Sequence, residues 1–208
     1  MLPYGHQTID DSDVQSVSSV LSSEWLTTGP TVDEFENNFS KFVNNWNAVA
    51  VSSGTAALHS SMYAADITNG DEVIVPAITF VATSNSVLYQ QGVPKFVDVE
   101  PESLLIDTDK IQDLISPKTK AIVAVDYAGQ PCDYASLNRI ADDNNLILIA
   151  DACHSLGGLY KDKKVGSLAN LNVFSFHPVK AITTGEGGMI TTDNEELAKK
   201  MRIFRNHG

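Results

Sequence analysis

The chain has 208 residues, 43% of them hydrophobic and 19% charged, which is enough apolar material for one substantial core. Acidic residues number 26 against 14 basic ones, and the net charge of −12 argues against nucleic acid or an anionic membrane surface as a partner. No apolar run approaches the roughly 20 residues that span a bilayer, and the N-terminus lacks a signal-peptide pattern, so we expect a cytoplasmic protein without membrane contact.

The N-terminal residues predict one short helix and a turn. Val14, Val17 and Val20 recur at helical spacing after an acidic start, which indicates an amphipathic helix over 10–21. The following segment, 25–30, breaks that helix, and taken alone it is a turn with a packed tryptophan, Trp25. We therefore expect residues 1–30 to form an N-terminal arm and helix.

A second helix is predicted next. The stretch from Thr31 to Glu34 has a capping-box pattern that marks a helix start. Phe35, Phe39 and Phe42 then give this helix an apolar stripe, which we assign to the core rather than to a ligand site.

Strand-like and helix-like segments alternate through the rest of the chain. Strands are predicted at 48–52, 72–75, 95–97, 121–125, 146–150, 173–176 and 189–192, and helices at 54–65, 80–91, 108–115, 135–144 and 194–205. Alternation at this density favours an α/β fold, with helices on both faces of a mostly parallel central sheet. The order of the strands does not follow from the sequence. Residues 31–208 are expected to form one large domain, a three-layer α/β/α sandwich.

Neither cysteine points to a metal or a disulfide. Cys132 and Cys153 lie far apart in the sequence, without a C-x-x-C pair or Cys/His ligand spacing. We expect a reducing compartment and no bound metal.

Lys180 stands out because of its surroundings. It lies between the apolar run 173–176 and the glycine-rich segment 185–188, with no charged residue within five positions on either side. An amine held away from water is a good nucleophile toward a carbonyl, so Lys180 is a Schiff-base candidate. The alternative is an ordinary solvated loop lysine.

Asp151 is the second candidate. It ends the apolar run 146–150, which is typical of a buried parallel strand, and ligands of open α/β sheets bind at the carboxyl edge of such strands. A carboxylate there can pair with a protonated ring nitrogen, which pyridoxal phosphate needs in order to act as an electron sink. The alternative is a helix cap at the end of a strand.

A phosphate site is predicted at Ser53, Gly54 and Thr55. These small residues follow a strand and open a helical pattern, and helix N-termini with hydroxyls and free N–H groups bind phosphate. An ordinary capped helix start has the same appearance.

The order of these elements resembles the fold-type I pyridoxal-phosphate enzymes. More narrowly, the chain is similar to the DegT/DnrJ/EryC1/StrS sugar aminotransferases over essentially its whole length. The motifs that carry this resemblance are Ser-Gly-Thr-Ala-Ala-Leu at 53–58, Pro-Ala-Ile-Thr-Phe-Val-Ala-Thr at 76–83, Asp-Ala-Cys-His at 151–154, Ser-Phe-His-Pro-Val-Lys at 175–180 and Gly-Glu-Gly-Gly at 185–188.

The resemblance implies further site residues. Phe80 would stack on the pyridine ring, although a core phenylalanine is the alternative from sequence alone. His154 would pack near the ring, where a lone histidine is otherwise structural. Ser175 would bind the phosphate, its alternative being simple strand alternation. Asp151 and Lys180 would be the catalytic pair. The segment 126–130 ends a buried strand and is assigned to the substrate or cofactor surroundings.

The resemblance also implies an activity. An amino group would pass from L-glutamate to a nucleotide-linked keto sugar, and similarity to the pseudaminic acid branch of the family implies C4 of a UDP-4-keto-6-deoxy-N-acetylhexosamine. Each active site would be shared between two subunits of a homodimer.

Two rival readings remain. Sugar dehydratases of the same fold use pyridoxamine phosphate, but they replace the lysine with histidine, so Lys180 argues against that activity. Relatives continue into a C-terminal domain beyond the position where this sequence stops. The chain is therefore expected to lack that domain, and a catalytically inert fragment that binds pyridoxal phosphate or dimerises is the other alternative.

Overall fold

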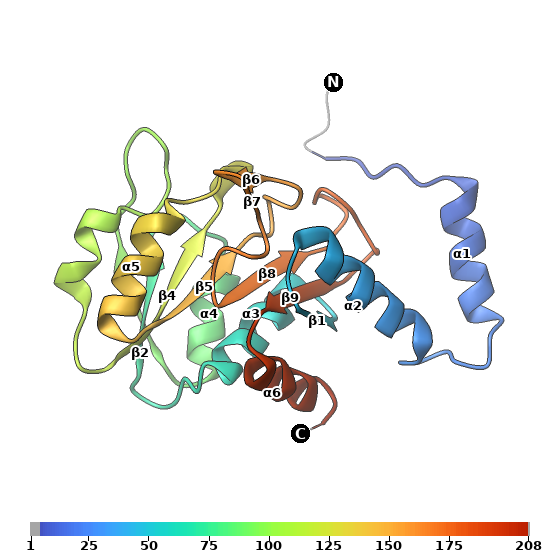
Figure 1. The fold of residues 1–208 in the computed structure, drawn as a ribbon, viewed down its shortest axis with the longest axis horizontal. Helices are drawn as coiled ribbons and strands as arrows, with labels where there is room; N and C mark the ends of the chain where they lie inside the picture. The colour runs from blue at the N-terminus through green and yellow to red at the C-terminus, as the bar shows by residue number, and fades with distance from the viewer. Residues whose placement is uncertain (1–4, 208) are drawn as a thin grey trace.

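The computed structural model describes residues 5–207, and a seven-stranded sheet forms its centre (Figure 1). The strands lie in the order β1-β9-β8-β5-β4-β2-β3. They are β1 (Asn47–Val51), β2 (Glu72–Pro76), β3 (Val93–Val97), β4 (Thr119–Val125), β5 (Ile147–Asp151), β8 (Leu171–Ser175) and β9 (Gly188–Thr192). Only β9 pairs antiparallel with its neighbours, β1 and β8, whereas the other pairs are parallel. The predicted mostly parallel sheet is confirmed.

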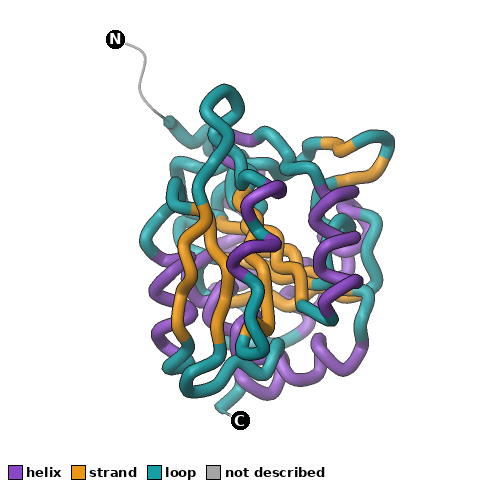
Figure 2. Tube along the Cα trace, turned by 90° about the vertical axis from the view of Figure 1, so that its left-hand side faces the viewer, coloured by secondary structure: helices purple, strands orange, loops and turns teal. Residues whose placement is uncertain are grey.

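Helices cover both faces of the sheet (Figure 2). The helices are α1 (Asp11–Leu21), α2 (Pro30–Val43), α3 (Gly54–Ala64), α4 (Ala82–Tyr89), α5 (Tyr134–Asn144) and α6 (Glu195–Arg205). Residues of α2 and α5 pack in one apolar cluster with the sheet, and residues of α3, α4 and α6 pack in the other. The result is the three-layer α/β/α sandwich that the sequence predicts.

Helix α2 is anchored by Phe39. Its ring meets Phe174 and Phe176 edge to face, with centroids 5.0 and 5.6 Å apart. Phe35 packs beside it, but the prediction that Phe42 belongs to the core is wrong. Phe42 is 52% exposed because the buried face of α2 runs from Phe39 to Val43, one turn along, and leaves Phe42 outside.

The start of α2 also differs from the prediction. The helix begins at Pro30, not at the expected capping box, and Gly29 is the N-cap with φ of +86°. Proline suits the first helical position because its missing N–H would have no partner there. A reciprocal capping box does occur, but in α1, between Asp10 and Asp13.

The predicted helix at 108–115 is wrong. Two 3-10 turns, Thr108–Lys110 and Gln112–Leu114, take its place. Their backbone N–H groups bond three residues back, as from Leu114 to the carbonyl of Ile111 at 3.0 Å. A small antiparallel hairpin, β6 (Leu159–Tyr160) and β7 (Lys163–Lys164), was not predicted.

Helix α1 forms as predicted but stands apart from the sheet (Figure 1). None of its residues is buried, and Val14 and Val17 are 55% and 60% exposed. Trp25, in the connection to α2, is 59% exposed, so the interpretation of a packed tryptophan is wrong. Across residues 5–207, every helix is too short or too polar to cross a bilayer.

Candidate functional site

Asp151 is the last residue of β5, at the edge where β4, β5 and β8 all end. Its carboxylate is buried, with 7% of the residue exposed. One oxygen accepts a hydrogen bond from the Thr83 hydroxyl at 3.0 Å, and the other accepts the backbone N–H of Cys153 at 3.3 Å. The parallel strands therefore deliver a fixed carboxylate to the carboxyl edge of the sheet.

Thr83 is a site residue to which sequence reasoning gave no role. It lies in the first turn of α4, fully buried, and its hydroxyl is 2.7 Å from that of Thr79 as well as in contact with Asp151. The two threonines are four residues apart, but only the hydrogen bond from Thr83 to Asp151 shows that they reach the acid. The pair holds the carboxylate in one orientation.

Lys180 reaches the same edge through His154. It lies in the loop after β8, half-buried, and its Nζ is 2.7 Å from Nε2 of His154. His154 follows Asp151 by one short turn. Partial burial, and then the charge of Lys180, lower the pKa of the His154 ring, so that it is neutral at pH 7 and able to accept a hydrogen bond from the lysine.

The predicted phosphate site lies at the N-terminus of α3. Ser53 is its N-cap, and its hydroxyl accepts the N–H of Ala56 at 3.1 Å. Among the described residues, no acceptor faces the N–H groups of Gly54 and Thr55. Such free amides at the positive end of a helix are suited to a phosphate.

Gly54 brings this helix start against the other elements. A Cβ at Gly54 would lie 2.8 Å from Cβ of Ser175 and 3.3 Å from Sγ of Cys153. Ser175 at the end of β8 and the loop after Asp151 therefore touch the phosphate site. The structure brings together at one edge Ser53, Gly54, Ser175, Asp151, His154 and Lys180, and Thr55 lies in the first turn of the same helix as Gly54.

Phe80 is a predicted site residue that is largely exposed to solvent. It precedes α4, which begins at Ala82 and not at Phe80 as predicted, and it is 74% exposed. The interpretation as a core phenylalanine is therefore wrong. No contact places its ring against Asp151 or Lys180 in this structure, although the carbonyl of Phe80 accepts the N–H of Thr83 at 3.0 Å.

The residues present fit pyridoxal phosphate. Unpaired helix amides and hydroxyls meet the needs of its phosphate, Asp151 those of a protonated ring nitrogen, and Lys180 those of its aldehyde. A glycine at position 54 leaves room that a side chain would fill.

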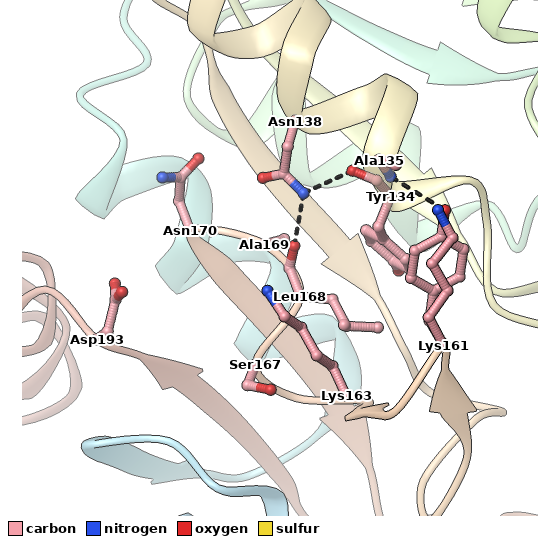
Figure 3. Close-up of a pocket in the computed structure, with 11 residues that line it drawn as sticks. Tyr134, Ala135, Asn138, Lys161, Lys163, Ser167, Leu168, Ala169, Asn170 and Asp193 are labelled. Carbon is pink, nitrogen blue, oxygen red and sulfur yellow. Dashed lines mark hydrogen bonds between the residues drawn. The ribbon is translucent and has the colours of Figure 1, made fainter.

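A separate hollow of about 440 Å³ lies between α5 and the segment that follows β7 (Figure 3). Its lining includes Tyr134, Asn138 and Lys163 (Figure 3). None of the eight predicted site residues lines it, so it is distinct from the edge described above.

The fold and this edge define a class, the fold-type I transferases, whose sheet the solved structures named below share. Residues 7–208 match the DegT/DnrJ/EryC1/StrS aminotransferase family, and the chain belongs to that family. The chain spans about half the length of the curated relatives that it matches, 54% and 53% of two of them.

Three proteins similar to this chain illustrate the match. The spore coat polysaccharide biosynthesis protein SpsC of Bacillus subtilis is 41% identical over 207 residues, which is 100% of this chain and 53% of SpsC. The PLP form of Spr1654 from Streptococcus pneumoniae, assigned as a sugar aminotransferase, superposes with a TM-score of 0.96 at 32% identity over 100% of this chain and 58% of its own. Helicobacter pylori PseC, an aminotransferase of pseudaminic acid biosynthesis, gives 0.93 at 37% identity over 99% and 56%.

Gly54 offers a test of the phosphate site. Replacing Gly54 with alanine should weaken pyridoxal phosphate binding on the order of tenfold or more, because the new methyl group would collide with Ser175. Titration of the cofactor, followed by its absorbance, measures this. The alanine should also lower the thermal midpoint of the cofactor-free chain. The double variant Gly54→Ala with Ser175→Gly removes the atoms nearest the new methyl group and should recover that midpoint. A thermal midpoint of the double variant as low as that of Gly54→Ala would contradict the collision with Ser175 as the cause.

The pKa of His154 predicts a pH dependence. Because this pKa is lowered in the folded protein, the unfolded chain binds the proton more readily, and His154 costs stability as the pH falls below its unfolded value of about 6.5. The wild type should therefore lose more thermal stability than His154→Gln between pH 7.5 and pH 5.5. Melting curves recorded at both pH values measure this, and an equal fall in thermal midpoint for the wild type and His154→Gln would contradict the prediction.

Proposed function

We propose that this chain binds pyridoxal phosphate and belongs to an enzyme that transfers an amino group from L-glutamate to a nucleotide-linked keto sugar. One observation carries the proposal. Nζ of Lys180 contacts the loop that follows Asp151, at 2.7 Å from Nε2 of His154, and this contact lies near the N-terminus of α3, where backbone N–H groups have no acceptor among residues 5–207. Similarity to Spr1654 in its PLP form supports the cofactor.

When bound, pyridoxal phosphate would supply an aldehyde and an electron-withdrawing ring. Ser53, Gly54, Thr55 and Ser175 would hold its phosphate with amides and hydroxyls. Asp151, kept in place by Thr83, would hold the proton on the ring nitrogen.

Phe80 would cover the open face of the ring, which its exposure allows. Lys180 would hold the cofactor through its aldehyde carbon, with loss of water, and once an amino donor has displaced it from that carbon, its Nζ would hold and move a proton as a general base. His154, being neutral, would accept a hydrogen bond from the amine of Lys180 and so orient it.

The finer proposal concerns the sugar. Similarity to PseC, together with the motifs at 125–133 and 176–188, supports C4 of a UDP-4-keto-6-deoxy-N-acetylhexosamine as the acceptor. We further propose that residues 31–208 are the cofactor-binding large domain, preceded by an arm at 1–30. Assay of a panel of nucleotide-linked keto sugars, with product analysis by NMR, tests the choice of sugar and carbon.

The basic test is chemical. The chain is incubated with pyridoxal phosphate, reduced with borohydride and mapped by peptide mass spectrometry, and a pyridoxyl adduct on Lys180 is expected. Glutamate should then convert the bound cofactor to pyridoxamine phosphate. No adduct would remove the aminotransferase proposal. An adduct without conversion would favour the alternative, an inert cofactor-binding or dimerising fragment.

We also propose a homodimer with shared active sites. Helix α1 and the segment after it carry exposed apolar side chains, among them Val17, Leu21 and Leu26, at 60%, 65% and 65% exposure. A helix with an apolar stripe and no buried residue is suited to cover a second subunit. Light scattering tests this, and a purely monomeric species would contradict it.

A further inference from the structure

Asp126, the residue after β4, is a buried carboxylate that the proposed reaction does not use. It is 1% exposed and accepts three hydrogen bonds, from the hydroxyl of Ser155 at 2.6 Å, the hydroxyl of Tyr134 at 2.8 Å and the N–H of Cys132 at 3.0 Å. Within residues 5–207, no lysine, arginine or histidine forms an ion pair with it. A charge buried in this way persists only where donors hold it tightly.

The shortest of these hydrogen bonds, from Ser155, connects Asp126 to the candidate site. Ser155 is the next residue after His154, whose ring contacts Lys180. The backbone N–H of Asp126 also donates to the carbonyl of Asp151 at 3.1 Å, so the acid lies directly beside the end of β5. Asp126 thus joins the loop after β4 to both ends of the segment 151–155.

A second contact fixes the same segment. Gly129, with φ of +91°, packs so closely that a Cβ there would lie 3.0 Å from the carbonyl oxygen of His154. The backbone of His154 is therefore held from one side by the turn 127–129 and from the next residue by the carboxylate of Asp126. Both contacts act on the backbone that carries the His154 ring, and the ring itself contacts Lys180.

We propose that Asp126 is a positioning residue that holds His154, through Ser155, at the distance needed to orient the amine of Lys180. Tyr134 and Cys132 complete the carboxylate's coordination from the start of α5 and keep it aimed at Ser155. The consequence for the reaction rests on the proposed function, because Lys180 is the reactive amine only in that proposal. The geometric claim itself concerns the cofactor-free chain.

The test separates positioning from stability. Ser155→Ala removes only the hydroxyl between Asp126 and the His154 segment. Ser60→Ala is the matched control, since Ser60 is also buried, at 1% exposure, but its hydroxyl has no hydrogen-bond partner. Asp126→Asn is the second variant, since an amide keeps the size of the carboxyl group but replaces one of its two acceptor oxygens with an NH2 donor, so the three donors around Asp126 can no longer all be satisfied.

The readout is the titration of the His154 ring in the cofactor-free protein, followed by NMR and assigned with His154→Gln among the five histidines. The groups that act on this ring are Lys180 and Asp151. In Ser155→Ala and Asp126→Asn the pKa of His154 should rise toward its ordinary value, as the ring separates from Lys180 and gains water. It should stay unchanged in Ser60→Ala.

An unchanged titration in folded Ser155→Ala would overturn the proposal, whatever its thermal midpoint. A second measurement is the rate of borohydride-trapped adduct formation at Lys180, expected to fall several-fold in Ser155→Ala and not in Ser60→Ala. If the wild type forms no adduct at all, the proposed function fails, whereas the NMR titration still decides whether Asp126 positions His154.

Discussion

Replacing Lys180 with alanine should abolish the borohydride-stable adduct of pyridoxal phosphate with this chain. The loop after β8 brings Lys180 half-buried to the edge of the sheet, where its amine is 2.7 Å from His154. A primary amine is needed to condense with the aldehyde, so no neighbouring group can replace it. Peptide mass mapping after reduction should therefore show no adduct, and the cofactor should leave on dialysis.

Two variants control this result. Lys199→Ala removes an exposed lysine of α6 and should leave the adduct at Lys180 intact. Lys180→Arg keeps a cation beside His154 but cannot condense, and it should behave as Lys180→Ala does. An adduct on another of the 11 lysines at the rate of the wild type would show that the amine at position 180 is not special.

The strand ends could be predicted because the signal for them is local. Apolar runs end at Asp151 and Ser175, and a parallel sheet must bring such ends to one edge. The lysine was found for a similar reason, since a cation without charged neighbours between a strand and a glycine-rich loop is visible in the sequence.

Other features depend on contacts between distant segments. Thr83 and Asp151 are 68 positions apart, and Ser155 and Asp126 are 29 apart, so no periodicity or motif reveals that they bond. The segment 126–130 was assigned to the site surroundings, but its mode of action was not visible. In the structure this segment meets residues 151–155 through the buried carboxylate of Asp126.

Local propensity also gave wrong answers where packing decides. Phe42, assigned to the core, is 52% exposed, and Phe80, expected to open a helix, is 74% exposed. The buried face of α2 leaves Phe42 outside the core, and Phe80 lies before the first residue of α4. The start of α2 was misplaced because a glycine with positive φ followed by proline outweighed the capping-box pattern one residue later.

Asp151→Asn should retain the cofactor adduct but slow the glutamate-driven conversion by on the order of 10²-fold or more. An asparagine can still accept the hydrogen bond that Thr83 donates at 3.0 Å, so the side chain keeps its place. It carries no charge, however, and a neutral amide cannot hold the ring nitrogen protonated, which removes most of the electron withdrawal that the ring offers. Stopped-flow absorbance of the cofactor during the glutamate half-reaction measures the rate.

Asp142→Asn, an exposed change on α5, is the control and should leave that rate unaltered. Asp151→Glu keeps the charge but adds a methylene group to a buried site, and it should retain more of the rate than Asp151→Asn. A rate for Asp151→Asn equal to that of the wild type, with the adduct present in both, would mean that the carboxylate at the end of β5 only terminates a strand. The charge at this position, rather than its hydrogen bonds, is therefore what the comparison measures.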